Sequence, residues 1–153
     1  MSGADVPGLF WTAFGWGGAI QLALDDPELL ADLPRTEVIM EFVTRVDSGY
    51  YYGGAHLFLG TLAGLKPRML GGNPDRSREH FETALRINKG AFLMTYVYYA
   101  RSYAVQTQNE ALFEELLNHV ASATNADPPS ARLANAIAKR KAQALLARKS
   151  DLF

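Results

Sequence analysis

The residues best suited to bind a metal or transfer a proton are three histidines, His56, His80 and His119. Each lies on a different predicted helix. None has a second ligand three or four residues away, the spacing that places two side chains on one helix face. Glu79 and His80 are adjacent, so they point to different sides of a helix. The sequence therefore predicts no metal site, and it predicts histidines that lie in the core or on the helix surface.

Other arrangements that enzymes use are also missing from the sequence. The chain has no cysteine, and no serine lies in a G-x-S-x-G or S-x-x-K motif. The glycine-rich residues 15–18 and 71–74 lack the Lys-Ser/Thr pair of a phosphate-binding loop. Asp25 and Asp26 are interpreted as residues that end one helix and cap the next, with Pro27 at its first position. We expect a protein that is not an enzyme and needs no cofactor.

Aromatic residues suggest binding rather than catalysis. Tyr50, Tyr51 and Tyr52 are consecutive and must point to three sides of a helix end. Such tyrosines either pack between helix layers with the hydroxyl at the rim, or line a groove or pore for an apolar ligand or a partner segment. The residues that we expect to form such a surface are Tyr51, Tyr52, Phe58, Tyr96, Tyr99 and Tyr103.

The elements that position these residues are predicted to be helices throughout. Helical apolar spacing or helix-capping residues mark residues 9–24, 34–46, 50–65, 74–88, 92–106, 110–124 and 130–149, with a short turn at 28–33. Asn73 and Ser130 are the predicted N-caps of the helices that follow them. No sustained alternation of apolar and polar residues indicates a sheet. The prediction is an all-α, antiparallel array of about seven helices in one domain, residues 1–153, with residues 1–8 disordered or derived from cloning.

Small residues indicate where helices approach each other. Gly60 and Ala84 permit close contact between the helices at 50–65 and 74–88, and Phe81 fills the space between this pair and the next. The spacing is typical of a tetratricopeptide (TPR) repeat, with five additional residues in the loop. Gly15, Gly17 and Gly18 likewise predict close approach of a neighbouring helix to residues 9–24.

The last predicted helix, 130–149, combines an apolar stripe with many basic residues. Leu133, Ile137, Ala144 and Leu145 are expected to pack on the preceding helices. The basic residues are expected to form a solvated face: Arg132, Lys139, Arg140, Lys141, Arg148 and Lys149.

Composition excludes several classes of protein. Apolar residues make up 48% and charged residues 20% of the chain, which is the balance of a folded globular protein. The net charge of −1 gives no indication of nucleic-acid binding. No apolar stretch reaches the 18 or so residues that a membrane-spanning helix needs.

Several short motifs follow one another along the chain. These are D-D-P-E-L-L-A-D-L-P at residues 25–34, G-A-H-L-F-L-G at 54–60, G-G-N-P at 71–74, R-E-H-F at 78–81, and the segments at 133–135, 145–147 and 151–153. In their order and spacing, the chain resembles the T-component of tripartite ATP-independent periplasmic (TRAP) transporters. The resemblance covers nearly all of the chain from Phe10 onward.

The resemblance implies a TPR-like, non-enzymatic accessory protein in the bacterial periplasm. It implies binding to the solute receptor of the transporter, a hydrophobic small ligand, and a homo-oligomer that is a trimer by analogy. The family is exported and often lipid-anchored, whereas this sequence shows no signal segment or anchoring cysteine, so we expect a processed or shortened form. The alternative is a generic cytoplasmic TPR scaffold that binds a peptide or protein partner through a charged concave face.

Overall fold

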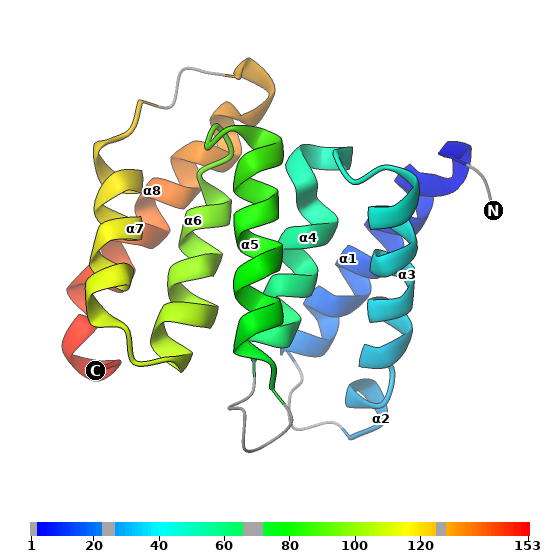
Figure 1. Cartoon of the computed structure of the whole chain (residues 1–153), viewed down its shortest axis with the longest axis horizontal. Helices are drawn as coiled ribbons and strands as arrows, with labels where there is room; N and C mark the ends of the chain where they lie inside the picture. Colours follow the sequence, from blue (N-terminus) through cyan, green and yellow to red (C-terminus); the bar gives the residue numbers. More distant parts are fainter. Residues whose placement is uncertain (1–2, 23–26, 66–71, 125–127) are drawn as a thin grey trace.

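The computed structural model describes residues 3–22, 27–65, 72–124 and 128–153 (Figure 1). The described residues form helices and turns without a strand, which confirms the all-α prediction for this part of the chain. The elements are η1 (Gly3–Asp5), α1 (Val6–Leu22), α2 (Pro27–Leu30), α3 (Leu33–Val46), α4 (Tyr50–Ala63), α5 (Pro74–Asn88), α6 (Met94–Tyr99), η3 (Ala100–Ala104), α7 (Glu110–Ser122), η4 (Pro129–Ala131), α8 (Arg132–Ala147) and η5 (Lys149–Asp151). The segment η3 is π-helical and continues α6.

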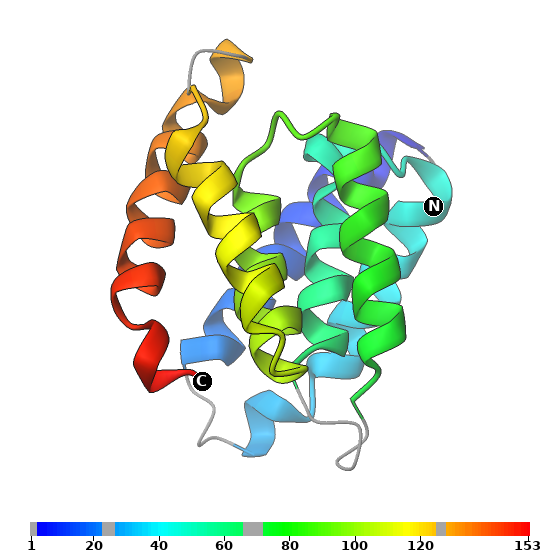
Figure 2. The same cartoon turned by 60° about the vertical axis from the view of Figure 1, so that its left-hand side comes forward.

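The helices pack in pairs along one direction. In Figure 1, α3, α5 and α7 lie in front of α1, α4 and α8, respectively. Figure 2 shows α7 and α8 side by side at the end of the array that holds the C-terminus. None of the described helices combines the length and the apolar character that a bilayer-spanning helix requires.

The core consists of two clusters that share α4. The first lies between α1, α3 and α4 and includes Phe10, Met40 and Leu59. The second extends from α4 to α8 and includes Leu57 and Phe113. Because α4 contributes to both clusters, its position determines how the two halves of the array fit together.

A face of small residues on α4 allows α5 to pack closely. A Cβ atom at Gly60 would lie 3.1 Å from the ring of Phe81 and 3.2 Å from the carbonyl oxygen of Ser77. The Ser77 hydroxyl donates a hydrogen bond to the Gly60 carbonyl at 2.7 Å. Phe81 in turn stacks on Tyr99 with ring centroids 5.0 Å apart, so it fills the space toward the next helix pair as predicted. A Cβ at Gly53 would lie 3.3 Å from the Cα of Ala84, so Ala84 packs against Gly53.

The first turn of α4 has a backbone that the sequence does not predict. Tyr51, Tyr52 and Gly53 all adopt left-handed conformations, with φ of 46°, 61° and 75°. For a non-glycine residue this conformation costs on the order of 1–2 kcal/mol. Asn88 offsets part of that cost by donating from Nδ2 to the Tyr52 carbonyl at 3.1 Å. The Tyr52 hydroxyl is also hydrogen-bonded to the Ser130 hydroxyl.

Local capping predictions have mixed outcomes. Asn73 accepts a hydrogen bond from the Arg76 backbone at 3.0 Å and Pro74 begins α5, as predicted. Ser130 does not cap the last helix, because α8 begins at Arg132 and the Ser130 side chain bonds Tyr52 instead. Asp25 and Asp26, together with Gly71 of the glycine-rich loop, lie outside the described residues.

Residues 3–8 lie in the segment for which the sequence suggests disorder or an origin in cloning. These residues form η1 and the beginning of α1, and the side chain of Val6 is buried in the first core cluster. The helix therefore starts three residues before the predicted Leu9, because Val6 adds an apolar contact to the same face as Phe10.

The predicted packing face of α8 is wrong at Leu133 and Ile137, whereas Leu145 packs against the second core cluster as expected. Leu133 and Ile137 are 75% and 42% exposed, whereas Asn135, Ala138 and Ala142 are buried. The Asn135 side chain accepts a hydrogen bond from the backbone of Leu93 and donates one to the carbonyl of Ala91, each at 2.9 Å. These two bonds connect α8 to the segment before α6, and they rotate Leu133 and Ile137 toward solvent.

We predict that Gly60→Val lowers the free energy of unfolding by about 2 kcal/mol, because the added carbons overlap Phe81 and the Ser77 backbone. Gly15→Val is the matched control, since a Cβ at Gly15 meets nothing within 4 Å. It should leave stability unchanged or slightly raised. Urea unfolding followed by circular dichroism measures both, and equal stabilities of the two variants would contradict this account of α4–α5 packing.

Candidate functional site

An apolar pocket opens between α1 and the C-terminal half of α4. Its volume is about 210 Å³. Neither α1 nor α4 contains a charged residue, so both helices offer apolar side chains on faces beyond the ones they bury in the core. The lining residues are Phe14, Gly17, Gly18, Ile20, Leu33, Leu57, Phe58, Thr61, Leu62, Leu65 and Tyr98.

Two glycines of α1 shape this pocket. A Cβ at Gly17 would lie 2.4 Å from the ring of Phe58, so the glycine lets this ring lie directly against α1. A Cβ at Gly18 would meet nothing within 4 Å. The prediction that all three glycines of α1 mark close helix approach is therefore wrong for Gly15 and Gly18, whose surroundings are open. Gly18 instead leaves space at the pocket wall.

A group of aromatic rings, some buried and some partly exposed, lies next to the pocket, with Phe14 belonging to both. We call it the aromatic cluster, and it consists of Phe10, Trp11, Phe14, Tyr50, Tyr51, Tyr52 and Phe92. The rings of Trp11 and Tyr51 are 4.8 Å apart, and Trp11 donates a hydrogen bond to the Tyr50 hydroxyl at 3.1 Å. Trp11, Phe14 and Tyr51 are 45%, 41% and 38% exposed. Exposed aromatic rings of this kind are typical of a binding surface.

The structure separates the six residues that the sequence suggested as one binding surface. Tyr51 and Tyr52 belong to the aromatic cluster, and Phe58 lines the pocket. The other three, Tyr96, Tyr99 and Tyr103, lie in the part of the array beyond α5. The residues that the sequence analysis did not select are Trp11, Phe14 and Tyr98.

The remaining three tyrosines contact other side chains of the helix array. Tyr99 is buried against Phe81, and its ring lies 5.3 Å from that of Tyr103. Tyr96 packs on His119 with ring centroids 4.5 Å apart. Burial raises the pKa of Tyr96, and burial together with Glu82 raises the pKa of Tyr99 to about 12. Both hydroxyls therefore stay protonated at neutral pH.

A second, polar feature lies on the other side of α4. The Nδ1 atoms of His56 on α4 and His80 on α5 are 2.9 Å apart. The expectation that each histidine lies apart from the others is therefore wrong for His56 and His80. Close packing of α5 on α4 brings these two residues into contact, although they are 24 positions apart in the sequence. Burial lowers the pKa of both rings, and with the additional effect of His56 and Arg76 the pKa of His80 falls to about 4.

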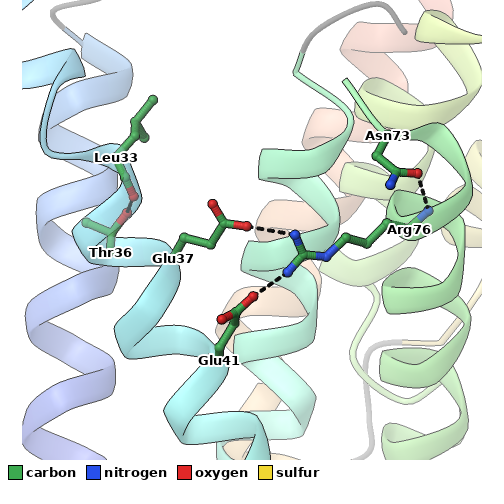
Figure 3. Close-up of polar contacts among 6 residues, drawn as sticks. All are labelled: Leu33, Thr36, Glu37, Glu41, Asn73 and Arg76. Carbon is green, nitrogen blue, oxygen red and sulfur yellow. Dashed lines mark hydrogen bonds and ion pairs between the residues drawn. The ribbon is translucent and has the colours of Figure 1, made fainter. Parts of the chain in front are cut away.

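An ion-pair fork connects α3 and α5 beside these histidines. Figure 3 shows Glu37 and Glu41 of α3 pointing toward the guanidinium group of Arg76 on α5. The two N···O distances are 2.8 Å and 2.5 Å. Arg76 lies in the first turn of α5, where the Asn73 cap fixes the backbone. The fork holds α3 against α5 across one edge of α4.

We predict that the protein loses stability as the pH falls from about 6.5 to about 4. In this range the unfolded chain binds a proton that folded His80 does not bind, so acid favours unfolding. The free energy of unfolding should fall by less than the ~1.4 kcal/mol per pH unit expected for a fully shielded group, because solvent screens the charges near His56 and His80. His80→Gln should lose less stability on acidification, whereas His119→Gln should behave like the unaltered chain. Urea midpoints at several pH values in EDTA measure the difference, and identical pH profiles for all three proteins would contradict it.

Comparison with known proteins identifies the family. The family model of the TRAP transporter T-component matches residues 1–153, the whole chain. A comparison with curated proteins finds no match to the sequence. The family match agrees with the resemblance seen in the sequence, and it assigns an accessory role in a TRAP transporter. The chain belongs to the TRAP transporter T-component family.

Proposed function

We propose that this T-component binds a small hydrophobic molecule in the pocket between α1 and α4 and docks on the solute receptor of its transporter. The observation that carries the proposal is the pocket itself, an opening of about 210 Å³ with almost entirely apolar walls. This size suits a compact ligand or one chain of a larger one.

The lining groups favour apolar burial over polar recognition. Thr61 donates its hydroxyl to the Leu57 carbonyl at 2.8 Å, so this hydrogen is already used inside α4. Tyr98 supplies the other hydroxyl of the lining. A ligand gains free energy here by moving apolar surface out of water, at about 25 cal/mol per Å².

The same lining supports a role in binding rather than catalysis. Tyr98 is the one titratable side chain among the described residues that line the pocket, and it has no carboxylate or imidazole neighbour there. General acid–base catalysis needs a group that exchanges a proton near neutral pH. We therefore propose a non-enzymatic accessory protein that holds its ligand unchanged.

The aromatic cluster is the proposed docking surface for the receptor. Trp11 and Tyr51 present partly exposed rings, which are the side chains that contribute most to protein interfaces. Because Phe14 lies in both the cluster and the pocket wall, a docked receptor would sit beside the pocket opening. This arrangement fits a periplasmic protein that passes a ligand to or from the receptor, within a homo-oligomer that we propose to be a trimer.

We predict that Gly18→Phe blocks the pocket, because Gly18 lines it and its Cβ position is open. N-phenyl-1-naphthylamine is an apolar probe that fluoresces when buried. It should bind the unaltered chain, and its affinity for this variant should be lower by about tenfold or more. Gly15→Phe is the control on the same helix, because Gly15 is open but does not line the pocket. Equal binding by both variants would exclude the pocket as the site.

For the docking surface, we predict that Trp11→Ser weakens binding to the transporter's solute receptor by about tenfold or more, since it removes an exposed aromatic anchor. Leu133→Ser, on the exposed side of α8, is the control and should have little effect. Surface plasmon resonance with the immobilised receptor measures both. A loss confined to Leu133→Ser would move the docking surface to α8.

A further inference from the structure

His56 and His80 bring two imidazole rings from neighbouring helices into direct contact. Their Nδ1 atoms are 2.9 Å apart and their ring planes are inclined by 44°. One N–H must lie between the two atoms, so one ring donates a hydrogen bond and the other accepts it. The second nitrogen of His56, Nε2, lies 3.3 Å from the Ser48 hydroxyl, so this ring has a polar partner on each side.

We propose that His56 and His80 together chelate one divalent transition-metal ion of the class that prefers imidazole, such as Zn²⁺, Cu²⁺ or Ni²⁺. Zinc–imidazole bonds are about 2.0–2.1 Å long, so two nitrogens on a tetrahedral ion lie about 3.3 Å apart. The observed separation of 2.9 Å then has to widen by about 0.4 Å. Small side-chain rotations provide a change of this size.

The proton balance of this step needs no additional reactant. In the metal-free pair, the donating ring carries its proton on Nδ1. When both Nδ1 atoms bind the ion, each neutral ring carries its proton on Nε2, so the donating ring exchanges one tautomer for the other. The Ser48 hydroxyl can then accept the Nε2–H of His56 and hold that ring in the metal-binding tautomer.

The surroundings determine what kind of metal site this is. The pair faces an open hollow of about 750 Å³, which leaves room for water ligands. The hollow is also lined by Glu41, Asp75 and Glu79, and by Arg45 and Arg76. Among the described residues no three histidine, aspartate or glutamate side chains are placed to hold a metal together. The site therefore offers two protein ligands with water completing the shell, which makes it exchangeable and unsuited to Mg²⁺ or Ca²⁺.

Calorimetric titration with zinc chloride tests the proposal on the EDTA-treated chain without an affinity tag. The unaltered chain should bind one Zn²⁺, and His56→Gln or His80→Gln should each reduce the affinity by about tenfold or more. His119→Gln is the matched control, because His119 is the third histidine of the chain and packs on Tyr96 instead. Its affinity should stay within about twofold of the unaltered chain.

Nitrogen-15 NMR of the histidine-labelled, unaltered chain keeps the test decisive even if a glutamine variant fails to fold. Zn²⁺ should shift the Nδ1 resonances of His56 and His80 and leave those of His119 in place. Failure to bind Zn²⁺, equal affinities for all three variants, or a shift confined to His119 would each overturn the proposal.

Discussion

The close contact between α4 and α5 is the constraint on which the rest of the structure depends. It exists because Gly53 and Gly60 on α4 leave room for Ala84 and Phe81 on α5, with the Ser77 hydroxyl bonded to the α4 backbone. Since α4 belongs to both core clusters, a wider spacing here would separate the two halves of the array. It would also move His56 away from His80. One stripe of small residues thus determines both the core and the polar site.

Helix α4 presents different chemistry on its two sides. Toward α1 it offers Phe58 and Leu62 to an apolar pocket, and toward α3 and α5 it offers His56 to a polar hollow. At its N-terminal end, the left-handed turn places Tyr51 against Trp11 and Tyr52 against Phe92. A strained backbone conformation persists only where surrounding contacts hold it in place. Here those contacts are the aromatic rings and the hydrogen bond from Asn88. The rings in turn border the pocket through Phe14.

Features that follow from local preferences or from a repeat spacing were predictable from the sequence, and features set by other contacts between distant residues were not. The Asn73–Pro74 start of α5 and the Gly60–Phe81 contact follow from capping preferences and repeat spacing. By contrast, Leu133 and Ile137 show the spacing of a buried stripe, but the bonds of Asn135 to a distant loop rotate α8. The histidine pair was missed for the same reason, because each histidine looks isolated along its own helix. Among the tyrosines, helical position alone did not distinguish buried Tyr99 from exposed Tyr51.

The most direct test of the α4–α5 contact is long-range ¹H–¹⁵N NMR of the histidine rings in the metal-free chain at neutral pH. The structure predicts one protonated and one unprotonated Nδ1 for His56 and His80, with a scalar coupling between these nitrogens across the N–H···N hydrogen bond. His119 should show no such coupling. Two rings that both carry their proton on Nε2 and show no coupling would mean that the imidazoles do not touch. That result would contradict the close packing of α4 on α5.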